Sequence, residues 1–213
     1  MNYRSLFRTS RVAVVTAALL GGGLSVAGAT SPAGASPAGP AAKHTVSYSV
    51  TCSVGIFGSQ TLKGSITMTT PNTVAAGAKF KATGVRITLQ IPKSLVNAGF
   101  AATIRSFKGK LTKYTVTNSD ATPKTVNGVG STGQPIPRTK IVQNQALTLF
   151  IPSKTATFSM GPFTAGSKGT DTGTAGATAA TVQALNSAGA VVTTINATCQ
   201  PPTTRKIWSV AVS

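Results

Sequence analysis

Residues suited to acid–base chemistry are scarce in this sequence. The chain has two carboxylates, Asp120 and Asp171, and one histidine, His44. General acid–base catalysis needs a positioned group that titrates near neutral pH, and hydrolytic pairs need two carboxylates at a defined separation. A Ser-His-Asp triad would have to combine His44 with one of these aspartates, and no nucleophile-elbow motif is present. The sequence therefore favours a non-catalytic protein.

Metal and cofactor ligands are equally few. The single histidine, the two separated aspartates and the two cysteines show none of the spacings of zinc or calcium sites. A haem could still be ligated by a histidine, tyrosine or methionine, and the candidates are His44, Tyr48, Met68, Tyr114 and Met160. Each of these types is more often a core or surface residue, so we predict no cofactor and keep haem or porphyrin as the alternative.

The N-terminal 43 residues have the composition of export and tether segments. In residues 1–29, three arginines precede an apolar stretch of small residues, and Ala27-Gly28-Ala29 fits a signal-peptidase site. Residues 30–43, TSPAGASPAGPAAK, have no large apolar side chain and predict a disordered tether. We expect residues 44–213 to form one domain, which is large enough for a core. No later segment reaches the roughly 20 apolar residues of a membrane span. We expect a secreted, extracellular protein that could stay associated with the cell envelope.

Cys52 and Cys199 are the only two cysteines. In an exported protein such a pair predicts a disulfide. Both lie in segments that alternate apolar and polar residues, HTVSYSVTCSV at 44–54 and VVTTINATC at 191–199. The bond would join the first strand of the domain to one of the last, and closing that loop is worth on the order of 5 kcal/mol at most.

The same two-residue period recurs along the domain. It is seen at 66–69, 85–91, 147–151 and 207–212, and Gly, Pro and Asn turns separate these segments. This pattern predicts an all-β, immunoglobulin-like antiparallel β-sandwich stapled by one disulfide. We expect one short helix over 93–98, a hairpin turn at 186–189, and Trp208 in the core or a rim groove.

The charge balance is strongly basic. The chain has 20 Lys and Arg residues against two acids, and removal of the three signal-peptide arginines leaves a net charge of +15. The densest cluster, IRSFKGKLTKY, also fits the solvated face of a strand. Its functional interpretation is an anion-binding groove built from Arg86, Arg105, Lys108, Lys110, Lys113, Arg138 and Lys140. Aromatic residues are 6% of the chain and do not interleave with the charges, so we expect no specific nucleic-acid recognition.

Several short motifs resemble those of an uncharacterised family of secreted actinobacterial immunoglobulin-like domains. They are Tyr48-Ser-Val-Thr-Cys52, Gly58-Ser-Gln-Thr, Ile91-Pro92, Pro135-Ile-Pro137 and Ala197-Thr-Cys199. In that family a tyrosine precedes an early cysteine, and a second cysteine lies near the C-terminus. The resemblance implies an immunoglobulin-like fold and export, without a catalytic activity.

Export, charge and inferred fold are also similar to the RoxP-like secreted antioxidants of skin propionibacteria. Their positively charged groove is thought to hold a cofactor, and this similarity implies radical scavenging through a bound anionic cofactor such as haem or porphyrin.

Two hypotheses on function follow from the sequence. The first is a non-catalytic module for an envelope polymer, a glycosaminoglycan, an acidic lipid surface or a small anionic ligand. The alternative is the cofactor-dependent antioxidant, and any activity would be of that kind rather than hydrolysis.

Overall fold

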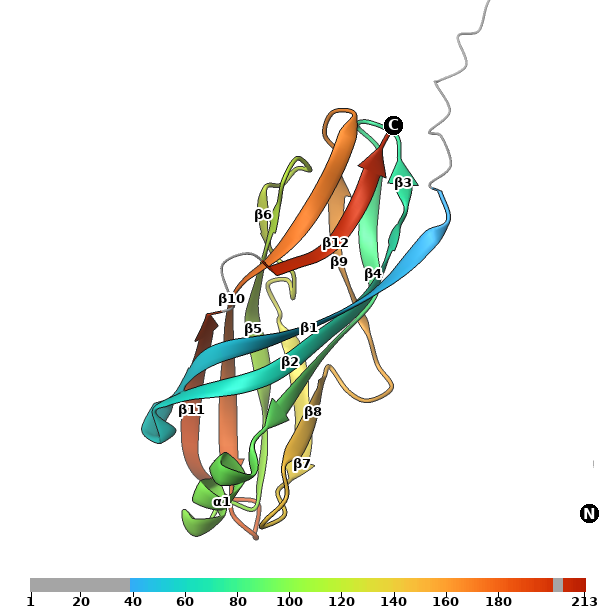
Figure 1. Cartoon of the computed structure of the whole chain (residues 1–213). Helices are drawn as coiled ribbons and strands as arrows, with labels where there is room; N and C mark the ends of the chain where they lie inside the picture. Colours follow the sequence, from blue (N-terminus) through green and yellow to red (C-terminus); the bar gives the residue numbers. More distant parts are fainter. Residues whose placement is uncertain (1–38, 201–204) are drawn as a thin grey trace, which may run out of the picture. The chain divides into compact units, whose positions relative to one another are not determined.

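The computed structural model describes residues 39–200 and 205–213 (Figure 1). The predicted signal peptide and most of the predicted tether lie outside these residues. The first strand begins at Ala41, so the last three tether residues are part of the sheet. The described elements are β1 (Ala41–Val54), η1 (Gly55–Phe57), β2 (Ser59–Pro71), β3 (Thr73–Val74), β4 (Lys79–Ile91), α1 (Lys93–Ala101), β5 (Ser106–Asn118), β6 (Thr125–Asn127), β7 (Gln134–Lys140), β8 (Leu147–Ile151), β9 (Phe158–Thr164), β10 (Gly169–Leu185), β11 (Val191–Gln200) and β12 (Arg205–Val212).

The strands form two layers that share one hydrogen-bonded path. The path runs β3-β12-β10-β11-β1-β2-β4-β8, with β5 added on β10, β7 on β5, and β9 on β4. In Figure 1 the ribbons of β1 and β2 cross those of β5, β10 and β11. Every pair is antiparallel apart from the two-residue β12–β3 pair. The predicted all-β sandwich with one disulfide is confirmed.

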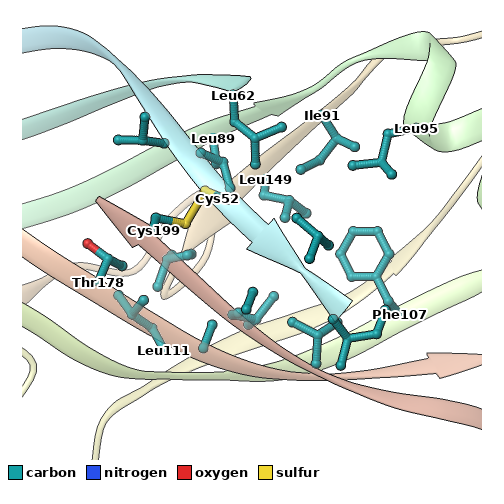
Figure 2. A pocket seen from close by; sticks show the side chains of 18 of the residues that line it. Cys52, Leu62, Leu89, Ile91, Leu95, Phe107, Leu111, Leu149, Thr178 and Cys199 are labelled. Carbon is teal, nitrogen blue, oxygen red and sulfur yellow. A yellow bond between two sulfur atoms is a disulfide. The ribbon is translucent and has the colours of Figure 1, made fainter. Parts of the chain in front are cut away.

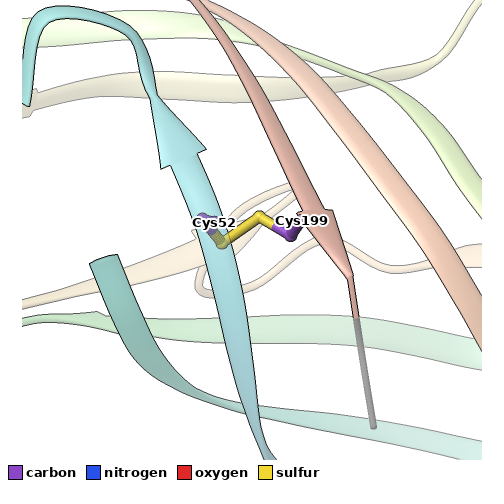
Figure 3. Close-up of a disulfide and its surroundings, with 2 residues drawn as sticks. All are labelled: Cys52 and Cys199. Carbon is purple, nitrogen blue, oxygen red and sulfur yellow. A yellow bond between two sulfur atoms is a disulfide. The ribbon is translucent and has the colours of Figure 1, made fainter. Parts of the chain in front are cut away.

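The two layers are joined by a short pairing between β1 and β11. Only Thr51–Val54 pairs with Ala197–Gln200, whereas β1 pairs with β2 over 13 residue positions. Cys52 and Cys199 are directly opposite each other in this short register, and their sulfur atoms are bonded (Figure 3). The predicted disulfide is confirmed, and it lies at the strand pairing that connects one layer to the other.

Local sequence explains the elements that position the site. Along β1 and β2, apolar side chains such as Val50 and Leu62 point inward and hydroxyl side chains alternate outward. Helix α1 begins after Pro92, whose fixed φ suits a helix start, and it ends three residues later than the expected 93–98. The expected hairpin joins β10 to β11, with Gly189 at a φ of +83°.

The main core contains a chain of three aromatic rings. Trp208 is 1% exposed, which confirms its predicted place in the core. Its ring centroid lies 5.4 Å from that of Phe163, and Phe163 lies 5.4 Å from Phe80. Ile207 is buried as well, although strict alternation would expose it. The β10–β12 register shifts at Gly173, and this bulge breaks the two-residue period.

Candidate functional site

Five of the seven predicted anion-binding residues lie on two neighbouring strands. Lys108, Lys110 and Lys113 are exposed on β5, and they alternate with inward-facing residues such as Leu111. Arg138 and Lys140 are exposed on β7, which pairs with β5. The Arg138 Nε donates a hydrogen bond of 3.2 Å to the Ser106 hydroxyl, which anchors its side chain beside β5. We call these five residues the basic face.

The other two predicted residues are placed elsewhere. Arg105 Nη1 donates to the carbonyls of Phe100 (2.8 Å) and Ile104 (2.9 Å), and its guanidinium carbon lies 3.7 Å from the Phe100 ring centroid. Arg105 therefore ties the end of α1 to the start of β5. Arg86 belongs to β4 in the opposite layer, and its Nε is buried without a hydrogen-bond partner among the described residues.

The two aspartates organise a loop and are not on the basic face. Asp171 is fully buried, and its Oδ1 accepts hydrogen bonds from the backbone N–H groups of Asp120 (2.8 Å) and Ala121 (2.9 Å). The Asp120 carboxylate in turn accepts from the Ser167 hydroxyl at 3.3 Å. Asp171 is a buried residue of β10, so its carboxylate is not available at the surface.

The potential haem ligands occupy three different environments. Met68 and Met160 are buried in the main core. His44 shares a hydrogen bond of 2.9 Å with the Thr70 hydroxyl, and partial burial together with nearby Lys206 lowers its pKa. Tyr48 and Tyr114 face the interior, as described below. Within the described residues, no three His, Cys, Asp or Glu side chains are grouped so as to hold a metal ion.

A polar groove of about 370 Å3 runs over the outer surface of β1, β2 and β4. Two rows of paired positions form its floor, because outward side chains stand side by side across antiparallel strands. Ser49, Lys63 and Gln90 form one row, and the next consists of Ser47, Ser65 and Thr88. The groove is lined by Ser47, Tyr48, Ser49, Lys63, Gly64, Ser65, Thr88, Gln90 and Arg205.

Arg205 enters this groove from β12 and donates through Nη2 to the Ser47 carbonyl. Its Nε is buried without a hydrogen-bond partner in the part of the chain that the structure describes. Lys63 is exposed on the opposite row. The groove therefore presents two cations, three serine hydroxyls, a threonine hydroxyl and an amide, a set that suits a ligand with negative charge and many hydrogen-bonding oxygens.

Sequence reasoning missed the groove because its parts are far apart along the chain. Ser47 and Arg205 are separated by 158 positions. The outward serines of SYSVT and KGSI were visible as polar positions of a strand, but alternation does not tell which strands become neighbours.

Residues 49–206 match a family of unknown function, DUF6801. The chain belongs to this family. The match includes every groove residue except Ser47 and Tyr48. No curated protein matches the DUF6801 chain. A solved structure, of a protein from Corynebacterium diphtheriae named as membrane-anchored, aligns at 19% identity with a TM-score of 0.48. The alignment covers 79% of the DUF6801 chain and 37% of that protein. Among the described residues, α1 included, no helix has the length and apolarity needed to cross a bilayer.

Proposed function

We propose that this protein is an extracellular, non-catalytic binding module for an acidic polysaccharide, such as an anionic envelope polymer or a glycosaminoglycan. The polar groove over β1, β2 and β4 is the observation that supports this proposal. The disulfide supports an oxidising, extracytoplasmic location, because such bonds persist there.

The chemistry of the groove favours a sugar polymer over other anions. Its serine, threonine and glutamine side chains can donate to and accept from sugar hydroxyls. Lys63 and the guanidinium group of Arg205, which both line the groove, can pair with a carboxylate or sulfate on the same chain. An acidic lipid surface would supply the charge but would leave most of these hydroxyls without ligand partners.

The basic face has a separate role in this proposal. Lys108, Lys110, Lys113, Arg138 and Lys140 lie in the layer that does not carry the groove. Like charges spread over a surface attract a polyanion from a distance and raise the rate of encounter. We therefore assign long-range attraction to the basic face and the short-range hydrogen bonds to the groove.

Calorimetric titration of the purified protein with chondroitin sulfate and with neutral dextran tests the proposal. We expect saturable binding of chondroitin sulfate alone. Lys63→Ala should weaken it about tenfold, because it removes a charge-assisted contact. Lys81→Ala removes an equal charge from an exposed position of β4 outside the groove, and it should change the affinity less than about twofold.

Two results would overturn this proposal. Equal weakening by Lys63→Ala and Lys81→Ala would show that only net charge matters. Binding to vesicles that contain phosphatidylserine, with no binding of chondroitin sulfate, would assign the basic surface to a lipid membrane instead.

A further inference from the structure

An apolar cavity of about 170 Å3 lies between the two layers of the sandwich. Figure 2 shows side chains from both layers pointing into this space, among them Leu62, Leu89, Leu111 and Leu149. Residues of three separate apolar clusters line it, so the cavity lies where these clusters fail to meet. No lysine, arginine, aspartate or glutamate is among the lining residues.

One end of the cavity carries hydroxyl groups. Thr178 of β10 is paired with Tyr114 on one side and with Cys199 on the other, and all three line the cavity together with Tyr48. Tyr114 is 2% exposed, and among the described residues its hydroxyl makes no hydrogen bond of normal geometry, although it lies close enough to the Tyr48 hydroxyl to interact with it. Burial, and then the neighbouring Tyr48, raises the pKa of Tyr114 well above its usual value, so the hydroxyl keeps its proton.

A space of this kind is unfavourable when empty. Voids much larger than a water molecule are rare in protein interiors, and their lining atoms lose dispersion contacts. Water does not fill such a space well, because a buried water needs two to four polar partners, whereas leucine, isoleucine and valine make up most of this lining. The Tyr114 hydroxyl adds the cost of an unmade hydrogen bond. One ligand could remove both penalties.

We propose that this cavity binds a small, uncharged, largely apolar molecule that carries a single hydrogen-bonding oxygen, of about the size of phenol. The size follows from comparison with engineered apolar cavities of about 150 Å3, which bind benzene. The absence of charge on the ligand follows from the uncharged lining, since a buried unpaired charge is strongly unfavourable. We assign the Tyr114 hydroxyl as the hydrogen-bond partner of the ligand's oxygen. This site is separate from the polar groove, and Tyr48 is the one residue that lines both.

Benzene and phenol form a matched pair of probes for this site. We expect each to bind the purified protein saturably at one site and to raise its melting temperature. Tyr114→Phe removes only the hydroxyl and should weaken phenol about fivefold while leaving benzene within about twofold. The same variant should melt close to the temperature of the parent, because the deleted hydroxyl makes no hydrogen bond of normal geometry in the free protein.

Filling the cavity provides the second arm of the test. Ala180 lines the cavity from β10, and Ala180→Leu should lower the affinity for both probes at least tenfold. Ala179→Leu is the matched control. Ala179 directly precedes Ala180 in the same strand and points to the other face of the sheet, so this substitution should leave binding unchanged. Absence of saturable binding of both probes to the folded protein would overturn the proposal. So would unchanged binding in Ala180→Leu. If Tyr114→Phe lowered the affinity for benzene as much as that for phenol, Tyr114 would not be the hydrogen-bond partner of the ligand.

Discussion

Tyr48 and Tyr114 show how burial fixes the chemistry of a side chain. The Tyr48 ring lies over Gly64 of β2, where a Cβ atom would approach the ring Cε2 to 2.9 Å. Burial raises the pKa of Tyr48 to about 12 and moves that of Tyr114 in the same direction. Both hydroxyls therefore stay protonated in the folded protein well above the pH at which an exposed tyrosine ionises.

We predict that the protein loses stability above about pH 10. In the unfolded chain both tyrosines ionise near pH 10. The folded protein then binds more protons than the unfolded chain, so the free energy of unfolding falls as pH rises from about 10 towards 12. Urea denaturation between pH 8 and 11.5 measures this fall. In Tyr48→Phe/Tyr114→Phe the decline should be shallower, and an identical pH profile in the variant would contradict the assignment to these tyrosines.

At the scale of the element, the critical contact is the short pairing of β1 with β11. Only four positions on each strand are paired there, yet this pairing connects the two layers. The Cys52–Cys199 bond crosses it and encloses a loop with a sequence separation of 147. Forming a short pairing between segments so far apart in the chain costs much chain entropy. The disulfide reduces the entropy lost on folding, because it already holds the two segments together in the unfolded state.

We predict that Cys52→Ala/Cys199→Ala lowers the free energy of unfolding by about 3–5 kcal/mol. Urea denaturation of the variant and the disulfide-bonded parent measures the difference. In hydrogen exchange, amides of Thr51–Val54 and Ala197–Gln200 should lose more protection than those of β2, which keeps its long pairing with β1. Uniform loss across both regions, or a change below about 1 kcal/mol, would show that the bond does not hold this junction.

At the scale of the whole molecule, the basic charges are largely uncompensated. The chain has 20 Lys and Arg residues and two aspartates, and the Asp171 carboxylate accepts from the backbone of the loop at 119–121 while that of Asp120 accepts from Ser167. Repulsion among so many like charges disfavours the compact state, while the same charges attract a polyanion. Salt screens both effects.

Stability and binding should therefore respond to salt in opposite directions. Between 20 and 300 mM NaCl we expect the melting temperature to rise by about 2–4 °C, which corresponds to roughly 1 kcal/mol for a domain of this size. Over the same range the affinity for chondroitin sulfate should fall at least tenfold. Scanning calorimetry and titration calorimetry in matched buffers measure the two effects. A melting temperature that falls with added NaCl would contradict the repulsion argument.

Local pattern was sufficient for much of the fold. Alternation in HTVSYSVTCSV and VVTTINATC predicted the strands that carry Cys52 and Cys199, because strand periodicity is a property of short segments. The presence of just two cysteines in a chain expected to be exported predicted the bond between them. The short helix after Pro92 and the burial of Trp208 were predicted for the same reason. The predicted anion-binding role of the basic residues stays a prediction.

Features that depend on which strands become neighbours could not be read from the sequence. Arg105 and Arg86 were expected in one anion-binding groove with the lysines of β5, but Arg105 stacks on Phe100 of α1 and Arg86 lies in the opposite layer. The polar groove needs Arg205 to reach Ser47 across 158 positions. The cavity depends on whether the inward side chains fill the space between the two layers. Alternation identifies which side chains point inward, but it does not give the volume of that space. The sequence by itself thus determined the strands whose residues alternate strictly, their inward faces and the disulfide. Only the tertiary structure decided the groove and the cavity, because both arise from contacts between segments distant in the chain.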